Sequence, residues 1–169
     1  MKVIILNASV KSARLDDATR SRIDLRLHNE VHAEQCAQVR TATKDALNEF
    51  GKERPEMGAV LNRAIKDGTF RSSIENGDNL DLNEPWNHGY EKSLKVSATA
   101  FGKAMMVDRK GFANNEDSER LRVRDGVDVN VCLDLKPNVS KQGTAGIYAN
   151  IVWVQYIGCL LYTSDAADE

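Results

Sequence analysis

The 169-residue chain is 41% hydrophobic and 28% charged, with a formal net charge of −2 at pH 7. This composition supplies the core of one ordinary domain, and the length is short for two. The small net charge excludes a histone-like polycation and a polyanion mimic, so an electrostatic site has to be local. The apolar run within residues 1–15 is too short for a signal peptide or a membrane span, and the three cysteines have no pairing or metal-ligand spacing. We expect a soluble protein of a reducing compartment.

The N-terminal part of the chain predicts two strands. The first, over residues 3–10, begins fully apolar and then alternates, and the second, over residues 22–29, has the two-residue period of a half-buried strand. In the second stretch the apolar side chains share one face. The opposite face carries Arg22, Asp24 and Arg26 and is expected to be exposed to solvent.

A helical segment follows these strands. Apolar residues recur at helical spacing from about residue 30, and Gly51 is the expected C-cap of this helix. A second helix is expected to begin at Pro55 and end at Gly68. The two helices form one insertion between strands, over about residues 30–67.

The rest of the chain is rich in short strands, which we expect at residues 94–101, 104–108, 121–124, 127–135 and 146–157. Every second residue from 127 to 135 is apolar, which makes this the clearest strand pattern in the sequence. The pattern predicts a mainly β, closed or nearly closed antiparallel barrel with the helices to one side.

Carboxylates in the loop expected at residues 76–89 suggest one catalytic alternative. Asp78, Asp81 and Glu84, together with Asp108, could hold a divalent cation for phosphodiester cleavage, as in a metal-dependent nuclease. The simpler interpretation is that Asp and Asn cap the backbone of a loop rich in turns. The sequence has no P-loop, dinucleotide fingerprint or nucleophile elbow. We therefore expect no enzymatic activity, no cofactor and no metal.

Basic residues gather in the second half of the chain, with ten Lys and Arg against seven Asp and Glu between Lys92 and Lys141. Arg120, Arg122 and Arg124 alternate with apolar residues, which predicts three guanidinium groups on one face of a strand. Such a row can follow a phosphate backbone and stack on bases. An exposed face without a ligand explains the same pattern equally well.

Aromatic residues complete this pattern, because proteins that bind single strands stack bases on aromatic rings. Alternation within residues 146–157 puts Tyr148 on the side opposite Trp153, whose apolar neighbours predict a core position. Tyr148 is then the better candidate for stacking. Lys95 and Phe101 are expected on one side of a single strand.

Two stretches carry a family resemblance: residues 88–111, "HGYEKSLKVSATAFGKAMMVDRKG", and residues 126–157, "GVDVNVCLDLKPNVSKQGTAGIYANIVWVQYI". The matching motif positions are Lys103, Val107, Asp108, Arg109 and Gly111, then Asn138, Gly143, Gly146, Ile147, Val154 and Gln155. These pieces resemble phage single-stranded DNA-binding proteins that carry an OB-fold. The likeness covers the chain from Gly89 to Ile157 and is faint before it.

The resemblance implies a single OB-fold-like Greek-key barrel over residues 1–158. It also implies non-catalytic, sequence-tolerant coating of single-stranded DNA during phage DNA replication and recombination, in the cytoplasm of the infected bacterium. Together with the basic and aromatic pattern it gives these expected DNA contacts: Lys95, Phe101, Lys103, Arg109, Lys110, Arg120, Arg122, Arg124, Lys136, Lys141 and Tyr148.

The last residues, 159–169, read "CLLYTSDAADE" and resemble a translated sequencing adapter, so we expect a non-native tail and a barrel truncated near Gly158. A natural acidic tail is the alternative. Proteins of this class commonly recruit replication and recombination proteins through an acidic tail, which this chain lacks or has replaced. The sequence does not decide whether the protein forms a homo-oligomer. A β-barrel that serves only as a structural or interaction module is a further alternative.

Overall fold

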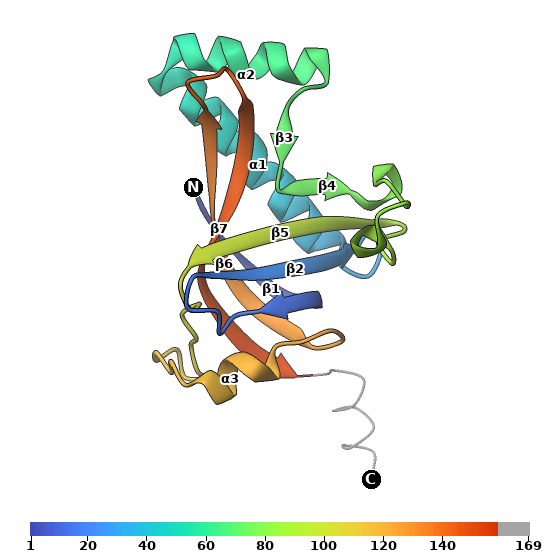
Figure 1. Ribbon diagram of the computed structural model, residues 1–169, viewed down its shortest axis with the longest axis vertical. Helices are drawn as coiled ribbons and strands as arrows, with labels where there is room; N and C mark the ends of the chain where they lie inside the picture. Colours follow the sequence, from blue (N-terminus) through green and yellow to red (C-terminus); the bar gives the residue numbers. More distant parts are fainter. Residues whose placement is uncertain (159–169) are drawn as a thin grey trace.

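The computed structural model describes residues 1–158 and is mainly β, with three α-helices in that part of the chain (Figure 1). The strands are β1 (Lys2–Arg14), β2 (Arg20–His28), β3 (Arg71–Ser72), β4 (Ile74–Asn76), β5 (Ser93–Phe101), β6 (Asp128–Val139) and β7 (Ala145–Gly158). The helices are α1 (Ala33–Glu53), α2 (Pro55–Asp67) and α3 (Asp117–Arg122). The expectation of a non-native tail lies outside the described residues.

Five strands close into a barrel in the order β1, β2, β5, β7 and β6. β1 pairs antiparallel with both β2 and β6, and β2 pairs antiparallel with β5. β6 and β7 form a long antiparallel hairpin, and a short parallel contact between Ala98 and Ala149 joins β7 to β5. This strand order is that of an OB-fold, and it confirms the predicted mainly β barrel with a helical insertion.

Alternating positions of the strands fill the barrel interior. Ile23, Leu25 and Leu27 of β2 are fully buried, on the face that the sequence predicted. The apolar set of residues 127–135 is buried as well, with Val129 and Val131 fully enclosed. A fully buried side chain of this kind contributes about 1.5–3 kcal/mol of hydrophobic stabilisation, so the apolar face of each strand determines which side points inward.

A β-bulge in β7 reverses this alternation. Cys132 lies opposite Trp153, but the next residue, Leu133, lies opposite Ile151, so β7 contains an extra residue. Cys132 also pairs with Ile4 of β1, whose side chain is half-exposed, and Trp153 therefore lies on the outer wall of the barrel. The predicted core position for Trp153 was wrong, because regular alternation does not anticipate an inserted residue.

The helical insertion covers one side of the barrel and its upper end in the view of Figure 1. α1 packs against the barrel through four small or β-branched residues, Cys36, Val39, Ala42 and Ala46. α2 lies across the tip of the β6–β7 hairpin, where Leu61 and Ala64 contact Ala145. Within residues 1–158 no helix has both the length and the apolar character needed to cross a membrane.

The ends of the two long helices agree with the predictions except at one point. α2 begins at Pro55, and Gly68 ends it with a left-handed φ of 74°, as expected. α1 continues to Glu53 instead of ending before Gly51. Gly51 lies where the two helices cross, and its Cα approaches Gly58 of α2. Gly51 therefore lies inside the helix and does not cap it, and the glycine that the close approach requires is Gly58, where a Cβ would meet the Gly51 backbone.

Two predicted strands are absent from the described part of the chain. Residues 104–108 make only isolated bridges, at Met106 and Val107, and residues 121–124 belong to α3 and the turn after it. α3 has Asp117 in its first turn and Arg122 in its last. These charges interact favourably with the helix dipole and so stabilise the helix. The predicted row of three guanidinium groups on a strand was therefore wrong.

The helix crossing gives a stability prediction. A Cβ atom added at Gly58 would lie 2.7 Å from the Cα of Gly51, which forces the helices apart. We expect Gly58→Ala to lower the free energy of unfolding by about 1–3 kcal/mol. Gly51→Ala is the matched control, because its added Cβ would meet Gly58 at an ordinary 3.8 Å and Ala favours a helix by up to about 1 kcal/mol. Urea unfolding checks both, and equal effects would contradict the packing argument.

Candidate nucleic-acid interface

The outward side of β1, β2 and β5 carries a group of arginines, two of which, Arg14 and Arg22, are paired with Asp17 and Asp24. Cross-strand pairing places Arg14 beside Arg22 and Arg22 beside Thr99, and it places Arg20 opposite Phe101. We call this surface the arginine face, and it consists of Arg14, Arg20, Arg22, Arg26 and Phe101. Its positions alternate with the buried residues of β2, so the strand that fills the core also presents the charges.

Phe101 is the most exposed large hydrophobic residue described, with 94% of its surface accessible. It is the last residue of β5, and its partner on β2 is a long, exposed arginine, Arg20, whose Nη2 donates to Thr99 Oγ1 at 3.3 Å. An open ring beside a guanidinium group is a surface on which an unpaired base can stack.

Asp24 holds the central arginine of this face in place. Arg22 donates to the Asp24 carboxylate through Nε and Nη2 at 3.0–3.2 Å, and Ser97 Oγ and Ser12 Oγ donate to it at 2.6 and 2.8 Å. Burial raises the pKa of Asp24, but these hydrogen bonds outweigh it and hold the pKa below its usual value. The same contact raises the pKa of Arg22. The Arg22 side chain nevertheless remains 56% exposed, so it is oriented and still accessible.

Lys95 lies on the same side of β5 as Phe101, as expected, but it is covered. Its exposure is 4%, its Nζ donates to Asn87 Oδ1 at 3.1 Å, and its ammonium group lies 5.1 Å from the centre of the Tyr90 ring. Burial raises the pKa of Tyr90, so the phenol is neutral. The loop between β4 and β5 therefore separates Lys95 from solvent.

A second group of predicted contact residues lies at the α3 end of the barrel. Lys103 pairs with Asp117 at 2.8 Å, and Arg109 Nη2 donates to the Ile157 carbonyl at 2.9 Å. The guanidinium carbon of Arg122 lies 4.0 Å from the centre of the Tyr156 ring. Lys110 and Arg124 complete the group, and both are exposed.

Arg120 differs from its neighbours because it is 6% exposed. Its guanidinium group donates to the main-chain carbonyls of Ala104 and Asn115 at 2.8 and 2.6 Å, and to Asp117 at 3.0 Å. These bonds connect α3 to the chain after β5. Its role here is structural, which the sequence pattern did not indicate.

The third group belongs to the β6–β7 hairpin, at the end of the molecule opposite α3 (Figure 1). Lys136 and Tyr148 face each other across the hairpin, and Lys136 lies 3.6 Å from Asp134. Tyr148 is 38% exposed, and its ring lies over Gly146, where a Cβ would meet the hydroxyl at 2.9 Å. Lys141 is exposed at the turn. The predicted residues thus form three groups and not one continuous row.

The sequence-based prediction omitted Arg14 and Arg20 and assigned Arg22 and Arg26 to no site. The available signal was the alternation over residues 22–29, which places two of these arginines on an exposed face. Sequence alone does not give the register between β2 and β5, and that register brings the arginines together with Phe101.

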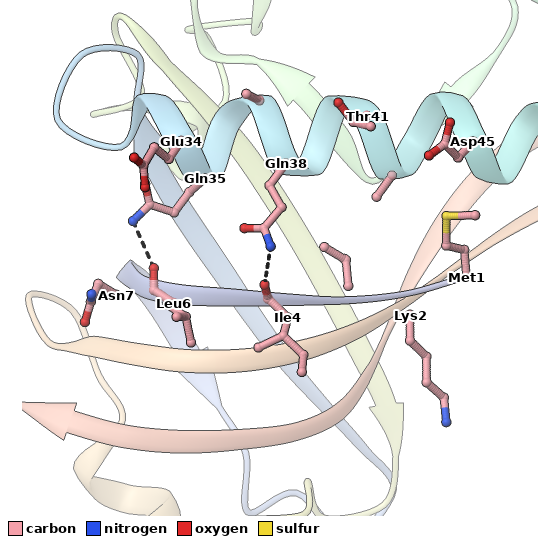
Figure 2. Close-up of a pocket in the computed structure, with 13 residues that line it drawn as sticks. Met1, Lys2, Ile4, Leu6, Asn7, Glu34, Gln35, Gln38, Thr41 and Asp45 are labelled. Atoms are coloured by element: carbon pink, nitrogen blue, oxygen red, sulfur yellow. Dashed lines mark hydrogen bonds between the residues drawn. The ribbon is translucent and has the colours of Figure 1, made fainter.

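A groove of about 890 Å³ runs between β1 and α1 (Figure 2), and no residue of the arginine face lines it. Gln35 and Gln38 reach across it and donate to main-chain carbonyls of β1 at 2.9 and 2.8 Å. Glu34 and Asp45 line its helix side. Lys2 lines its strand side, so the charges of this groove are mixed and it is not a basic surface like the arginine face.

The loop carboxylates serve the backbone. Asp78 and Asp81 accept main-chain N–H groups at 3.0 Å, as the capping alternative predicted. Outside this loop, Asp108 accepts two main-chain N–H groups at 2.9 and 3.0 Å. Within residues 1–158 no group of three or more His, Cys, Asp or Glu side chains is arranged to hold a metal ion.

The contrast between the buried Arg120 and the exposed Arg124 gives a stability prediction. Arg120→Met leaves buried carbonyls without a donor, so we expect the free energy of unfolding to fall by about 2–4 kcal/mol. Arg124 is exposed and lies two residues after the end of α3. Arg124→Met should therefore change the free energy of unfolding by less than about 0.5 kcal/mol. Thermal melts of both variants check this, and a wild-type melting temperature for Arg120→Met would overturn the structural role.

Asp24 gives a pH prediction. A carboxyl whose pKa is lowered by folding stabilises the protein above its unfolded pKa of about 3.9, and this contribution disappears as the pH falls through the lower, folded value. Asp24→Asn should therefore cost about 1–2 kcal/mol at pH 7, limited by the exposure of Arg22, and much less at pH 2. Asp45→Asn, on the exposed side of α1, is the control. A loss that is independent of pH would contradict the assignment.

Comparisons with known proteins agree with this geometry at the level of the fold. No family model and no curated protein matches the chain. A C-terminally truncated single-stranded DNA-binding protein from bacteriophage Enc34 has a similar structure, with a TM-score of 0.66 and 17% identity over 93% of this chain and 84% of that one. The Enc34 protein in complex with single-stranded DNA gives a TM-score of 0.62 and 15% identity over 93% and 86%. The chain therefore has the fold of phage single-stranded DNA-binding proteins, as the sequence resemblance implied.

Proposed function

We propose that this chain binds single-stranded DNA without catalysis and with little dependence on sequence, through the arginine face. The observation that carries the proposal is the exposed Phe101 ring beside the exposed Arg14, Arg20 and Arg22 on an OB-fold barrel. The fold is shared with phage proteins that are described as single-stranded DNA-binding, one of them in complex with its ligand.

The physical argument has two parts. Guanidinium groups pair with phosphates and release counterions, which gives affinity that is independent of sequence and falls as salt rises. Aromatic rings stack any base, because every base has a π-face. In OB-folds the second and third barrel strands commonly provide the binding surface, and β2 and β5 occupy those positions here.

The other predicted contacts extend this path in the proposal. Lys103 follows Phe101 by two residues, and Arg109, Lys110, Arg122 and Arg124 continue the basic surface towards α3. At the opposite end, Tyr148 and its partner Lys136 lie next to the residues through which β7 meets β5, and Lys141 lies further out, in the turn of the β6–β7 hairpin. We propose a role in phage DNA replication and recombination, inside the infected host cell.

Fluorescence anisotropy of a labelled oligothymidine tests the proposal at low and then at moderate salt. We expect binding whose logarithm falls linearly with the logarithm of the salt concentration, by about 0.7 for each phosphate contact. Phe101→Ala should weaken binding by about 1–3 kcal/mol, or roughly 5- to 150-fold, without changing this slope. Ile65→Ala removes a half-exposed apolar side chain from α2 and should leave the affinity unchanged.

Several outcomes would contradict the proposal. Folded protein that does not bind at low salt would favour the interaction-module alternative, with self-association as its sign. A preference for duplex over single strands would refute the proposed ligand. Cleavage of the labelled DNA on addition of Mg²⁺ or Mn²⁺ would favour the nuclease alternative.

A further inference from the structure

The loop over residues 77–92, between β4 and β5, presents another exposed aromatic ring, that of Trp86. Trp86 is 65% exposed and Leu82 is 58% exposed, although large apolar side chains are costly to leave in water. Hydrogen bonds nevertheless hold the loop backbone in place. Asp78 Oδ1 accepts the Lys92 N–H at 3.0 Å, and His88 Nε2 lies 2.6 Å from the Leu82 carbonyl. The indole therefore projects from a fixed loop.

The buried Lys95 provides the anchor of this loop. An ammonium group taken out of water is costly unless its hydrogen bonds are satisfied, and here the acceptor is the neutral Oδ1 of Asn87, beside the Tyr90 ring. Asn87 in turn donates through Nδ2 to the Asp81 carbonyl at 2.9 Å, and it is 9% exposed. Asn87 is thus held inward, while its neighbour in the same 3-10 turn, Trp86, stays exposed.

The loop lies at the end of the arginine face that is far from Phe101. Arg26 Nη1 donates to the Gly89 carbonyl at 3.2 Å, and Arg26 pairs with Lys95 in the register of β2 and β5. Phe101 is six residues further along β5 than Lys95, which corresponds to about 20 Å of strand. The arginines thus lie between two exposed aromatic residues, one at each end.

We propose that Trp86 is a second platform on which an unpaired base of the bound strand stacks, and that Lys95 is the positioning residue that holds the Trp86 loop. This inference rests on the proposed function and specifies more of the same site. A strand that follows the arginines from Phe101 reaches the loop next, and an indole offers a larger stacking surface than a phenyl ring. A protein partner that covers Trp86 and Leu82 is the competing explanation, and the experiments below separate the two.

The chain contains two tryptophans, which allows a direct test. Trp153→Phe, on the outer wall beside Cys132, leaves Trp86 as the only indole. We expect oligothymidine to quench the tryptophan fluorescence of this variant. The midpoint of the quenching should fall at the same concentration as the midpoint of the anisotropy change measured with labelled oligothymidine. Trp86→Ala should weaken binding roughly 5- to 150-fold with an unchanged salt slope.

The role of Lys95 needs a measurement that separates positioning from phosphate contact. Lys95→Met removes the ammonium group and keeps the apolar stem, so we expect weaker binding, at most as weak as that of Trp86→Ala, and an unchanged salt slope. A direct phosphate contact would instead lower the slope by about 0.7. Lys92→Met, which removes an exposed charge from the same loop, is the matched control and should leave Trp86 quenching intact.

The outcomes distinguish this inference from the proposed function. If anisotropy shows binding but Trp86 is not quenched and Trp86→Ala binds normally, the inference is wrong and the proposed function stands. If no oligothymidine binds at low salt, the proposed function is wrong, and the inference that rests on it is wrong as well. If Trp86→Ala abolishes self-association in sedimentation experiments and leaves DNA binding intact, the loop is a protein-docking surface. Because Trp86 is exposed, its replacement tests the platform even if Lys95→Met does not fold.

Discussion

Antiparallel pairing of β2 with both β1 and β5 determines which side chains meet on each side of the barrel wall. The inward side of β2 gives Ile23, Leu25 and Leu27 to the core, and its outward side gives the arginines of the candidate interface. A shift of one residue in this register would bury the guanidinium groups and expose the core. The free energy that stabilises the barrel therefore also fixes the position of the basic surface.

The electrostatics of this surface are local, as the small net charge requires. Asp24 lies among the arginines and binds Arg22 on one side, and two serine hydroxyls satisfy its remaining lone pairs. The carboxylate reduces like-charge repulsion along the row without covering it, because Arg22 stays half-exposed. A local group of arginines of this kind can bind a polyanion even though the chain as a whole has a small negative net charge.

Where sequence periodicity alone decided the structure, the prediction was confirmed. The two faces of β2 and β6 and the start and end of α2 follow from alternation, a proline and a glycine. The predictions that failed depend on information from distant parts of the chain. Trp153 lies on the outer wall because β7 contains one inserted residue. Residues 121–124 form the end of α3 and the segment after it, beside Arg120, whose acceptors are carbonyls of Ala104 and Asn115. Local alternation contains neither fact.

The candidate site was harder to predict than the fold, for the same reason. Arg20 and Phe101 are 81 positions apart in sequence and become neighbours only through the pairing of β2 with β5. Lys95 is the clearest case: its place on the outward side of β5 was predicted, but its burial depends on Asn87 and Tyr90 folding back over it. A lysine that is exposed by its strand position and buried by a loop is better placed to orient that loop than to attract a phosphate. For this reason we assign Lys95 to the support of the interface and the exposed arginines to its surface.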